Sequence, residues 1–238
     1  MKTFLCNKKM KTFTFIAISL LSGAIAGALL GLINQGIVEP FIDKAIGIET
    51  QRELNAGKIV DNTQQSQYRI WQKEGEIVAA TITGISLASL FGVVFAYSRN
   101  SMPVSNNKTK ALILASLMFF VLFLVPALKY PTNPPAVGNP STIYFRENLF
   151  VGFIAISGFS TLALSLLYRR LGSKDRLKMK IAVSLIYATI MATAYLIFPS
   201  NPDNIAIISA DLIISFRISS VFTMGVFWGL LGITFGMF

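Results

Sequence analysis

Six apolar stretches, each long enough to cross a lipid bilayer, dominate the pattern of hydrophobic and polar positions along the chain. A helix that rises about 1.5 Å per residue needs about 20 mostly apolar residues to cross a hydrocarbon core of about 30 Å. The stretches of this kind are residues 12 to 35, 76 to 97, 111 to 129, 147 to 168, 179 to 198 and 217 to 238. The pattern predicts an all-α, polytopic transmembrane helix bundle of about six spans, with residues 1–238 forming a single integral membrane domain.

Charged residues fall unevenly on the loops that join these stretches. Residues 1 to 11, 98 to 110 and 169 to 180 lie on one side and carry 13 of the 21 Lys and Arg residues, against one acid, Asp175. The loops and helix ends of the opposite side carry the other 8 basic residues and 10 acids. Because short loops rich in Lys and Arg remain in the cytoplasm, we predict a multi-pass protein of the plasma membrane with both termini cytoplasmic.

The composition narrows the range of functions. Hydrophobic residues make up 53% of the chain and the mean hydropathy is +0.62, so the lipid bilayer is the expected main partner. The net charge of +10 comes from short loops rather than from a folded basic face, so we expect no nucleic-acid partner. The chain has no His and one Cys, Cys6, and it lacks phosphate-loop, HExxH and EF-hand motifs. We therefore expect neither an enzyme nor a bound cofactor.

The first apolar stretch follows a cluster of lysines, as signal peptides do, but it is long enough to predict a retained helix. Gly23, Gly27 and Gly31 recur in it every four residues, a spacing that lets two helices pack closely in lipid. Continuing by fours reaches Gln35 and Glu39, so we expect both polar side chains to face the bundle. The last stretch has two similar glycine pairs, Gly225 with Gly229 and Gly232 with Gly236.

Three longer connections lie on the acid-rich, outer side. Residues 36 to 75 form a long outer segment that ends in an amphipathic stretch, where Trp71 suits the membrane interface. Residues 130 to 146 are rich in Pro and Asn, and residues 199 to 211 form a third connection. These connections contain the least generic sequence of the chain.

Two acids open the second predicted span. If residues 68 to 97 form one helix, Glu74 shares a face with Trp71, whereas Glu76 lies on another face beside Lys73. We therefore predict that Glu74 points inward, with a solvated helix end as the alternative. Glu76 is predicted to form a surface ion pair.

Arg217 interrupts a run that is otherwise apolar from Leu212 onward. An arginine at such a depth costs several kcal/mol unless it snorkels, meets water or finds a counter-ion. The acids on the same side that could pair with it are Glu39, Glu74, Glu147 and Asp211. A structural ion pair or snorkelling is the first hypothesis, and a direct role in gating or substrate binding is the second.

Motifs spread along almost the whole chain resemble those of one known family. They are Gln35, Glu39 and Pro40 after the first helix, Trp71, Glu74 and Gly75 at the second span, FLVPALKYPTNPPAVGNP at 123 to 140 with Pro131, Pro134 and Pro135, Arg146, FRISS at 216 to 220, Trp228, Gly232 and FG at 235 to 236. The segment LKYPTNPP is the most specific, because proline at this density fixes an extended, turn-rich path. In these residues the chain resembles the CbtA family of probable cobalt transporter subunits.

The resemblance implies a subunit of a cobalt uptake system that works with a small histidine-containing membrane partner. Such a partner could supply ligands that a histidine-free chain lacks. From the residues themselves, the acid-rich outer side would attract a divalent cation, which prefers oxygen ligands. The candidate ion pathway consists of Gln35, Glu39, Glu74, Glu147, Asp211 and Arg217, and Asp203 is a further oxygen donor.

Three functions are consistent with these features. The first is a membrane permease, or a permease subunit, for a metal cation, with cobalt indicated by the resemblance. The second is an accessory or structural subunit of a larger membrane complex, in which the Pro-rich loop docks a partner. The third, a carrier of an organic anion that uses Arg217 as its anion site, fits the acid-rich outer side less well. The spacing of the oxygen donors does not select cobalt over nickel or magnesium, so the metal ligands stay open.

Overall fold

The computed structural model describes residues 12–102, 104–171, 176–201 and 208–237. These ranges fold into helices joined by short connections and contain no strand, which confirms the all-α prediction. The helices are α1 (Thr12–Ile37), α2 (Glu39–Asn55), α3 (Asn62–Ser98), α4 (Asn107–Phe119), α5 (Val125–Lys129), α6 (Ile143–Leu171), α7 (Arg176–Ile197) and α8 (Ala210–Met237). Three shorter elements accompany them: η1 (Arg99–Ser101), the π-helical turn η2 (Phe120–Leu124) and η3 (Pro140–Thr142).

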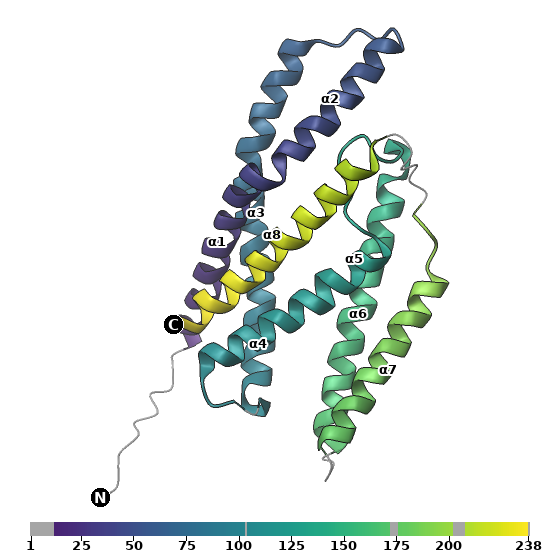
Figure 1. Cartoon of the computed structure of the whole chain (residues 1–238). Coiled ribbons are helices and arrows are strands. Elements are labelled where there is room, and N and C mark those ends of the chain that lie inside the picture. Colours follow the sequence, from purple (N-terminus) through teal and green to yellow (C-terminus); the bar gives the residue numbers. More distant parts are fainter. Residues whose placement is uncertain (1–11, 103, 172–175, 202–207, 238) are drawn as a thin grey trace, which may run out of the picture.

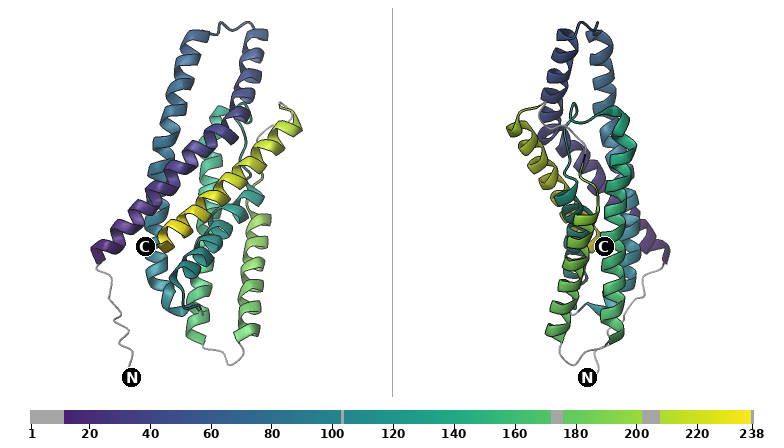
Figure 2. Two further views of the ribbon diagram at one scale, coloured as in Figure 1. Left: turned by 60° about the vertical axis from the view of Figure 1, so that its left-hand side comes forward. Right: turned by 90° about the vertical axis from the view of Figure 1, so that its right-hand side faces the viewer.

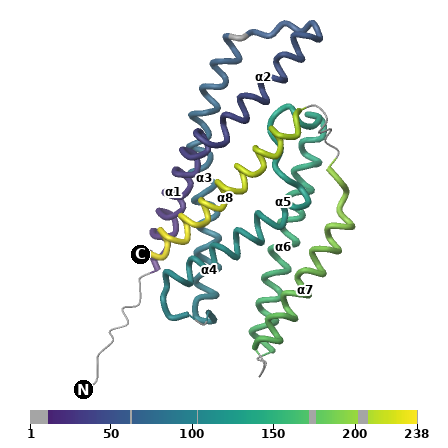
Figure 3. The backbone as a smooth tube through the Cα atoms, in the orientation of Figure 1, coloured from purple at the N-terminus to yellow at the C-terminus, as the bar shows by residue number. Residues whose placement is uncertain are grey.

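Six helical segments are long and apolar enough to cross a membrane, which confirms the six predicted spans. One of them combines α4, η2 and α5, because the helix continues from Asn107 to Lys129 (Figure 3). The chain is therefore a multi-pass membrane helix bundle. Cys6, Asp175 and Asp203, which entered the sequence interpretation, lie outside the described residues.

The long outer segment is itself helical. α2 and the first part of α3 form an antiparallel hairpin, in which Gly57 adopts a positive φ of 77° at the turn. Asp61 caps α3 by accepting hydrogen bonds from the N–H groups of Thr63 (2.9 Å) and Gln64 (3.1 Å). The 37 residues of α3 span about 55 Å, which exceeds the hydrocarbon core of about 30 Å. The hairpin consequently projects beyond the other helices (Figures 1 and 2).

The loops of the two predicted sides lie at opposite ends of the bundle. In Figure 1, the start of α1, the end of α8, the α3–α4 connection and the facing ends of α6 and α7 lie toward the lower end. The α2–α3 turn, the loop after α5 and the start of α8 lie toward the upper end. The basic loops therefore lie at one end of the bundle and the acid-rich loops at the other, as the charge distribution predicted. That the basic end is cytoplasmic stays a prediction.

The main core lies where α1, α3, α4 and α8 meet. The ring of Phe235 packs edge-on against the rings of Phe15, Phe91 and Phe95, with centroids 5.7, 5.0 and 5.0 Å apart. Trp228 is buried in the same cluster. α6 and α7 form a second hairpin that packs on α5 and η2. The core thus fixes α1 against α3, from which the projecting hairpin extends.

Glycines bring α1 and α3 into backbone contact. A Cβ atom added to Gly27 would lie 2.8 Å from the Cα of Thr81, and one added to Gly84 would lie 2.7 Å from the Cα of Gly27. In α8, a Cβ on Gly232 would lie 2.9 Å from the Cβ of Ala115. The predicted close packing is confirmed for α1 and for the second glycine pair of α8, whereas the earlier pair of α8 has no contact closer than ordinary van der Waals distance.

The π-helical turn leaves one backbone carbonyl without a partner from its own helix. The N–H of Val125 bonds to the carbonyl of Phe120 rather than to that of Val121. The next residue, Pro126, has no N–H to offer. The carbonyl of Val121 therefore needs a donor from another helix, because an unpaired polar group in an apolar interior is costly.

Ser157 of α6 supplies this donor. Its Oγ lies 2.6 Å from the carbonyl oxygen of Val121 and 2.8 Å from the hydroxyl of Tyr187 in α7. Ser157 is fully buried. Because Ser157 donates to the carbonyl, Tyr187 donates to Ser157. This chain of hydrogen bonds joins the third, fourth and fifth spans.

Replacing Ser157 by alanine is expected to destabilise the protein by about 1–2 kcal/mol, because it removes the donor to Val121 and the acceptor for Tyr187. Thermal unfolding in detergent measures the effect. Ser165→Ala is the matched control, since Ser165 lies exposed on the same helix and bonds only to the carbonyl of Leu162 in its own turn. Equal unfolding temperatures for the two variants would contradict the role assigned to Ser157.

Candidate functional site

A pocket of about 780 Å³ opens between α2 and the first part of α3, where the hairpin leaves the bundle. Pro135 of the Pro-rich loop closes one side of it. The charged residues that line it are Glu39, Glu49, Arg69 and Glu76. Three carboxylates and one guanidinium thus face this hairpin pocket.

Arg69 holds the two sides of the hairpin together. Its guanidinium forms an ion pair with Glu39, which is only 5% exposed, and a second one with Asp43 at 2.8 Å. Lys73 also pairs with Asp43, at 2.8 Å. Partial burial acts to raise the pKa of Asp43, but the hydrogen bonds and charges of Lys73 and Arg69 outweigh it and lower that pKa. The ion pairs of Asp43 therefore persist at neutral pH and weaken only as the pH falls through this lowered pKa.

Gln35 and Glu39 both point toward α3, as the fourfold spacing from the glycines predicted. The side-chain amide of Gln35 donates a hydrogen bond of 2.7 Å to the backbone carbonyl of Lys73. Glu39 is the first residue of α2, and Pro40 follows it in the first turn, where a missing N–H costs nothing. The chain thus turns from α1 into α2 while keeping both side chains on the face that meets α3.

The inward carboxylate of α3 is Glu76, so the predicted surface ion pair of Glu76 was wrong, and for Glu74 the exposed alternative holds rather than the inward position. Glu74 is exposed, whereas Glu76 is half-buried, accepts a hydrogen bond from the side chain of Asn34 and lies close to Glu39 and Arg69. The reason is the helix register: Trp71, which the prediction placed on the inner face with Glu74, is 66% exposed. Glu76 follows Arg69 by seven residues, or two turns, so these two share the face that meets α2.

Two acceptor atoms in this region are buried without a hydrogen-bond donor. They are Oε2 of Glu76 and Oδ1 of Asn34. Buried polar atoms in proteins are nearly always paired, and an unpaired one costs about 1–3 kcal/mol. Because the side chains of Glu76 and Asn34 already share a hydrogen bond, each unpaired oxygen needs a further partner, which a cation or a water molecule would supply.

A sequence signal for this site existed. Gln35, Glu39 and Asp43 recur every four residues, and Arg69, Lys73 and Glu76 recur at spacings of four and three. Each set lies on one helical face, and the two sets carry complementary charges. Comparing the two faces would have shown the hairpin and its inward groups.

Arg217 binds the Pro-rich loop instead of an acid. Its Nη2 donates a 2.7 Å hydrogen bond to Oδ1 of Asn133, and its Nε donates a 3.3 Å bond to the carbonyl of Thr132. In the ranges that the structure covers, Arg217 has no ion pair within 4 Å, so the ion pair that the first hypothesis offered beside snorkelling was wrong. These neutral partners stabilise the half-buried charge of Arg217, and they occupy donors that an anion would need.

The loop that Arg217 holds is folded into the bundle. Pro134 is fully buried, and Val137 packs with Ala45 of α2 and Leu212 of α8. The hydroxyl of Tyr130 donates a 2.7 Å hydrogen bond to the carbonyl of Pro199. The neighbouring Pro131 is half-buried. The loop therefore forms a rigid wall between α2 and α8, with Pro135 facing the hairpin pocket.

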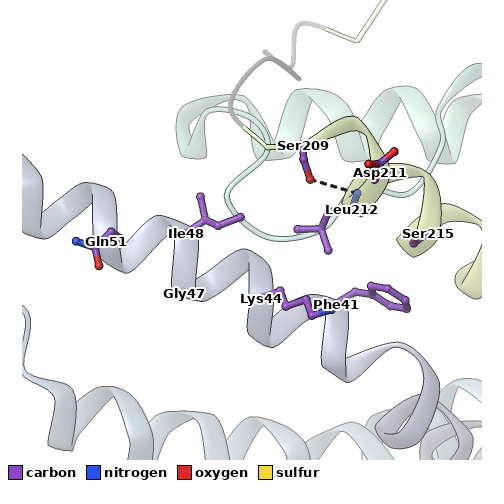
Figure 4. A pocket seen from close by; sticks show the side chains of 9 residues that line it. All are labelled: Phe41, Lys44, Gly47, Ile48, Gln51, Ser209, Asp211, Leu212 and Ser215. Atoms are coloured by element: carbon purple, nitrogen blue, oxygen red, sulfur yellow. Dashed lines mark hydrogen bonds between the residues drawn. The ribbon is translucent and has the colours of Figure 1, made fainter.

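Glu147 and Asp211 do not join the hairpin pocket. Both are exposed. Asp211 lies at the start of α8 on a separate pocket of about 570 Å³, whose other wall is α2 with Lys44 (Figure 4). Ser209 there accepts a 3.4 Å hydrogen bond from the N–H of Leu212, which is drawn as a dashed line. Of the predicted ion pathway, the structure brings Gln35 and Glu39 together and separates the other members.

The oxygen donors do not form a complete metal cage. No group of three or more Asp, Glu, Cys or His side chains with metal-binding geometry occurs among the described residues. Glu39, Glu76 and Asn34 offer two carboxylates and one amide, which is a partial oxygen shell for a divalent cation. Such a shell can attract and partly dehydrate an ion while leaving positions for water or for ligands of another subunit.

Comparison with known proteins defines the family. The family model described as "Probable cobalt transporter subunit (CbtA)" matches residues 12–238, nearly the whole chain. The chain belongs to the CbtA family. No curated protein and no solved structure matches it. Membership in CbtA and the six spanning helices together identify a membrane transport subunit.

Four of the residues that carry the resemblance to CbtA meet at the hairpin pocket. Glu39, Trp71, Gly75 and Pro135 all line it. The ring of Trp71 is stacked on the ring of Tyr68, with centroids 5.7 Å apart, at the exposed rim. Positions far apart in the CbtA pattern therefore meet at one place in the fold.

Proposed function

We propose that this CbtA-family chain is the membrane-embedded subunit of a cobalt uptake system of the plasma membrane, and that its hairpin pocket receives the cation on the outer side. The observation that carries the proposal is the pair of buried, donor-free oxygens of Glu76 and Asn34 beside the buried carboxylate of Glu39. Divalent cations bind carboxylate and amide oxygens. The acid-rich outer end raises the local concentration of cations.

The proposal assigns selectivity to a second subunit. Oxygen ligands bind cobalt, nickel and magnesium without strong preference, whereas imidazole favours first-row transition metals over magnesium. This chain has no His. We therefore propose that a small histidine-containing membrane partner completes the coordination shell and selects the metal.

Uptake of radioactive cobalt by cells that express the chain with its partner tests the proposal. Glu76→Gln is expected to lower uptake at least about tenfold, because it removes the charge from the one inward carboxylate without an ion pair. Glu74→Gln is the matched control: Glu74 lies two residues away on the same helix but is exposed, so its uptake should stay at the wild-type level. Both variants must reach the membrane in equal amounts. Wild-type uptake by Glu76→Gln would refute the assigned pocket.

A second candidate function, an accessory subunit that docks an enzyme or permease and conducts nothing, is favoured by the projecting hairpin. α2 and the start of α3 extend beyond the other helices, and Trp71 lies exposed on this extension. Purification in mild detergent distinguishes the two functions. A stoichiometric complex, together with no cobalt flux into liposomes that contain the complete complex, would favour the accessory function.

A further inference from the structure

We infer that Arg69 is a built-in counter-cation of the hairpin pocket, which occupies Glu39 in the empty state and is displaced toward Asp43 when a divalent cation binds. The inference rests on the proposed function of the pocket, since it concerns how the same carboxylates exchange one positive charge for another. It makes Arg69 a positioning residue that sets the affinity and release of the ion.

Arg69 now takes the place that a metal ion would take at Glu39. The side chain of Glu39 is only 7% exposed, and the guanidinium of Arg69 pairs directly with its carboxylate. A buried carboxylate without a cation is strongly unfavourable, so an empty pocket needs a substitute charge. Arg69 supplies this charge from α3, one turn before Lys73 and two turns before Glu76.

The same guanidinium already contacts a second carboxylate, that of Asp43. The Nη2 atom that pairs with Glu39 also lies 2.8 Å from Oδ1 of Asp43, whose side chain is 47% exposed. Arg69 can therefore leave Glu39 and keep a carboxylate partner in a wetter position. Its hold at Glu39 is also incomplete, because its Nε is buried without an acceptor.

Glu76 and Asn34, near Glu39, offer oxygens that Arg69 does not use. Oε2 of Glu76 and Oδ1 of Asn34 are buried and have no donor. Neither can be satisfied by another acceptor, whereas a cation placed among Glu39, Glu76 and Asn34 would satisfy all three. A dication there would repel a guanidinium that remained on Glu39, since like charges at this distance in a partly buried site destabilise each other. Binding of the ion and departure of Arg69 are therefore coupled.

This competition has a use in transport. A site must bind an ion strongly enough to capture it and weakly enough to release it. The two carboxylates and the amide, with no counter-charge beside them, would hold a divalent cation tightly. When the ion leaves, Arg69 returns to Glu39 and lowers the free energy of the metal-free state. The metal-bound state is then less stable relative to the metal-free state. Removing Arg69 should strengthen binding, which is the opposite of what loss of a purely structural ion pair would do.

Cobalt titration of the purified full-length protein in detergent tests the inference, with calorimetry as the measure of affinity. Quenching of Trp71, which lines the pocket, reports binding at this place, and Trp71→Phe shows how much of the fluorescence change comes from it. Arg69→Gln is expected to bind cobalt at least about tenfold more tightly than the wild type. Lys73→Gln is the matched control: it removes a positive charge that touches only the exposed Asp43, so its affinity should change less than threefold.

The outcomes separate this inference from the proposed function. If the wild type shows no saturable cobalt binding, the pocket is not a cation site and the proposed function fails. If the wild type binds cobalt and a folded Arg69→Gln binds it equally or more weakly, the counter-cation role is overturned while the pocket remains. If Arg69→Gln does not fold, Arg69→Met decides, because methionine keeps a long unbranched stem for packing but carries no positive charge. Tighter binding by Arg69→Met supports the inference, and equal or weaker binding overturns it.

Discussion

Gly27→Ala should greatly reduce the amount of folded protein in the membrane and its thermal stability in detergent. The new methyl group would press on the backbone carbonyl oxygen of Ala80 and would lie 2.8 Å from the Cα of Thr81. Backbone atoms of a packed helix cannot move aside as a flexible side chain can, so α1 and α3 must separate. Overpacking of this kind costs about 1–3 kcal/mol, and the contact also supports the position of the hairpin above it.

The matched control is Gly36→Ala, in the last turn of the same helix, where an added Cβ meets nothing within 4 Å. It should unfold at or slightly above the wild-type temperature, because alanine favours a helix by up to about 1 kcal/mol over glycine. Fluorescence-detected size-exclusion chromatography after heating measures both variants. The interpretation of α1–α3 packing would be wrong if Gly27→Ala were as stable as Gly36→Ala.

The spans could be predicted because bilayer thickness imposes one simple requirement on the sequence. A window of about 20 apolar residues is visible without knowing any neighbour. The glycine spacing in α1 predicted a helix contact for a similarly local reason, since only a missing side chain allows backbones to touch. The partner of that contact, Gly84 and its neighbours in α3, could not be read from α1 alone.

The candidate site was predicted only in part because its residues face one another across two helices. Gln35 and Glu39 followed from the register of α1, but Glu76 required the register of α3 relative to α2. The exposed Trp71 misled the assignment, since an aromatic residue at the membrane interface has the same composition signal as one in a core. Arg69 escaped notice for a related reason: its partners, Glu39 and Asp43, lie about 30 residues away in the sequence.

The Pro-rich loop shows a different limit of sequence reasoning. Proline density predicted an extended, turn-rich path, and the structure has one, with Ala136 and Gly138 at positive φ values of 66° and 97°. Whether such a path lies on the surface or inside depends on a partner elsewhere in the chain. Here the partner is Arg217, for which an ion pair or snorkelling had been expected. Arg217 instead donates to a backbone carbonyl and to a side-chain amide. The sequence alone does not show which of the available acceptors an arginine will bind.

Arg217→Ala should release the Pro-rich loop from α8 and thereby open one wall of the hairpin pocket. It removes one hydrogen bond to Asn133 and one to the carbonyl of Thr132. Hydrogen bonds to a charged group contribute about 1.5–3 kcal/mol, so hydrogen exchange of residues 130 to 139 should accelerate about tenfold to a hundredfold. Because Pro135 lines the pocket, cobalt affinity should fall as well.

Two further substitutions separate loop anchoring from a charge needed for gating. Arg217→Gln keeps a neutral donor within the same region, whereas Arg217→Lys keeps the charge but not the planar fork that reaches two acceptors. If Arg217 acts by holding the loop, both variants should show intermediate exchange rates, and cobalt uptake should follow loop protection across the series. Uptake that is retained by lysine and lost by glutamine, with equal protection of the loop, would instead assign Arg217 to the ion pathway. Unchanged exchange in Arg217→Ala would remove the anchoring role altogether, because the loss of both Arg217 hydrogen bonds would then leave the loop as protected as before.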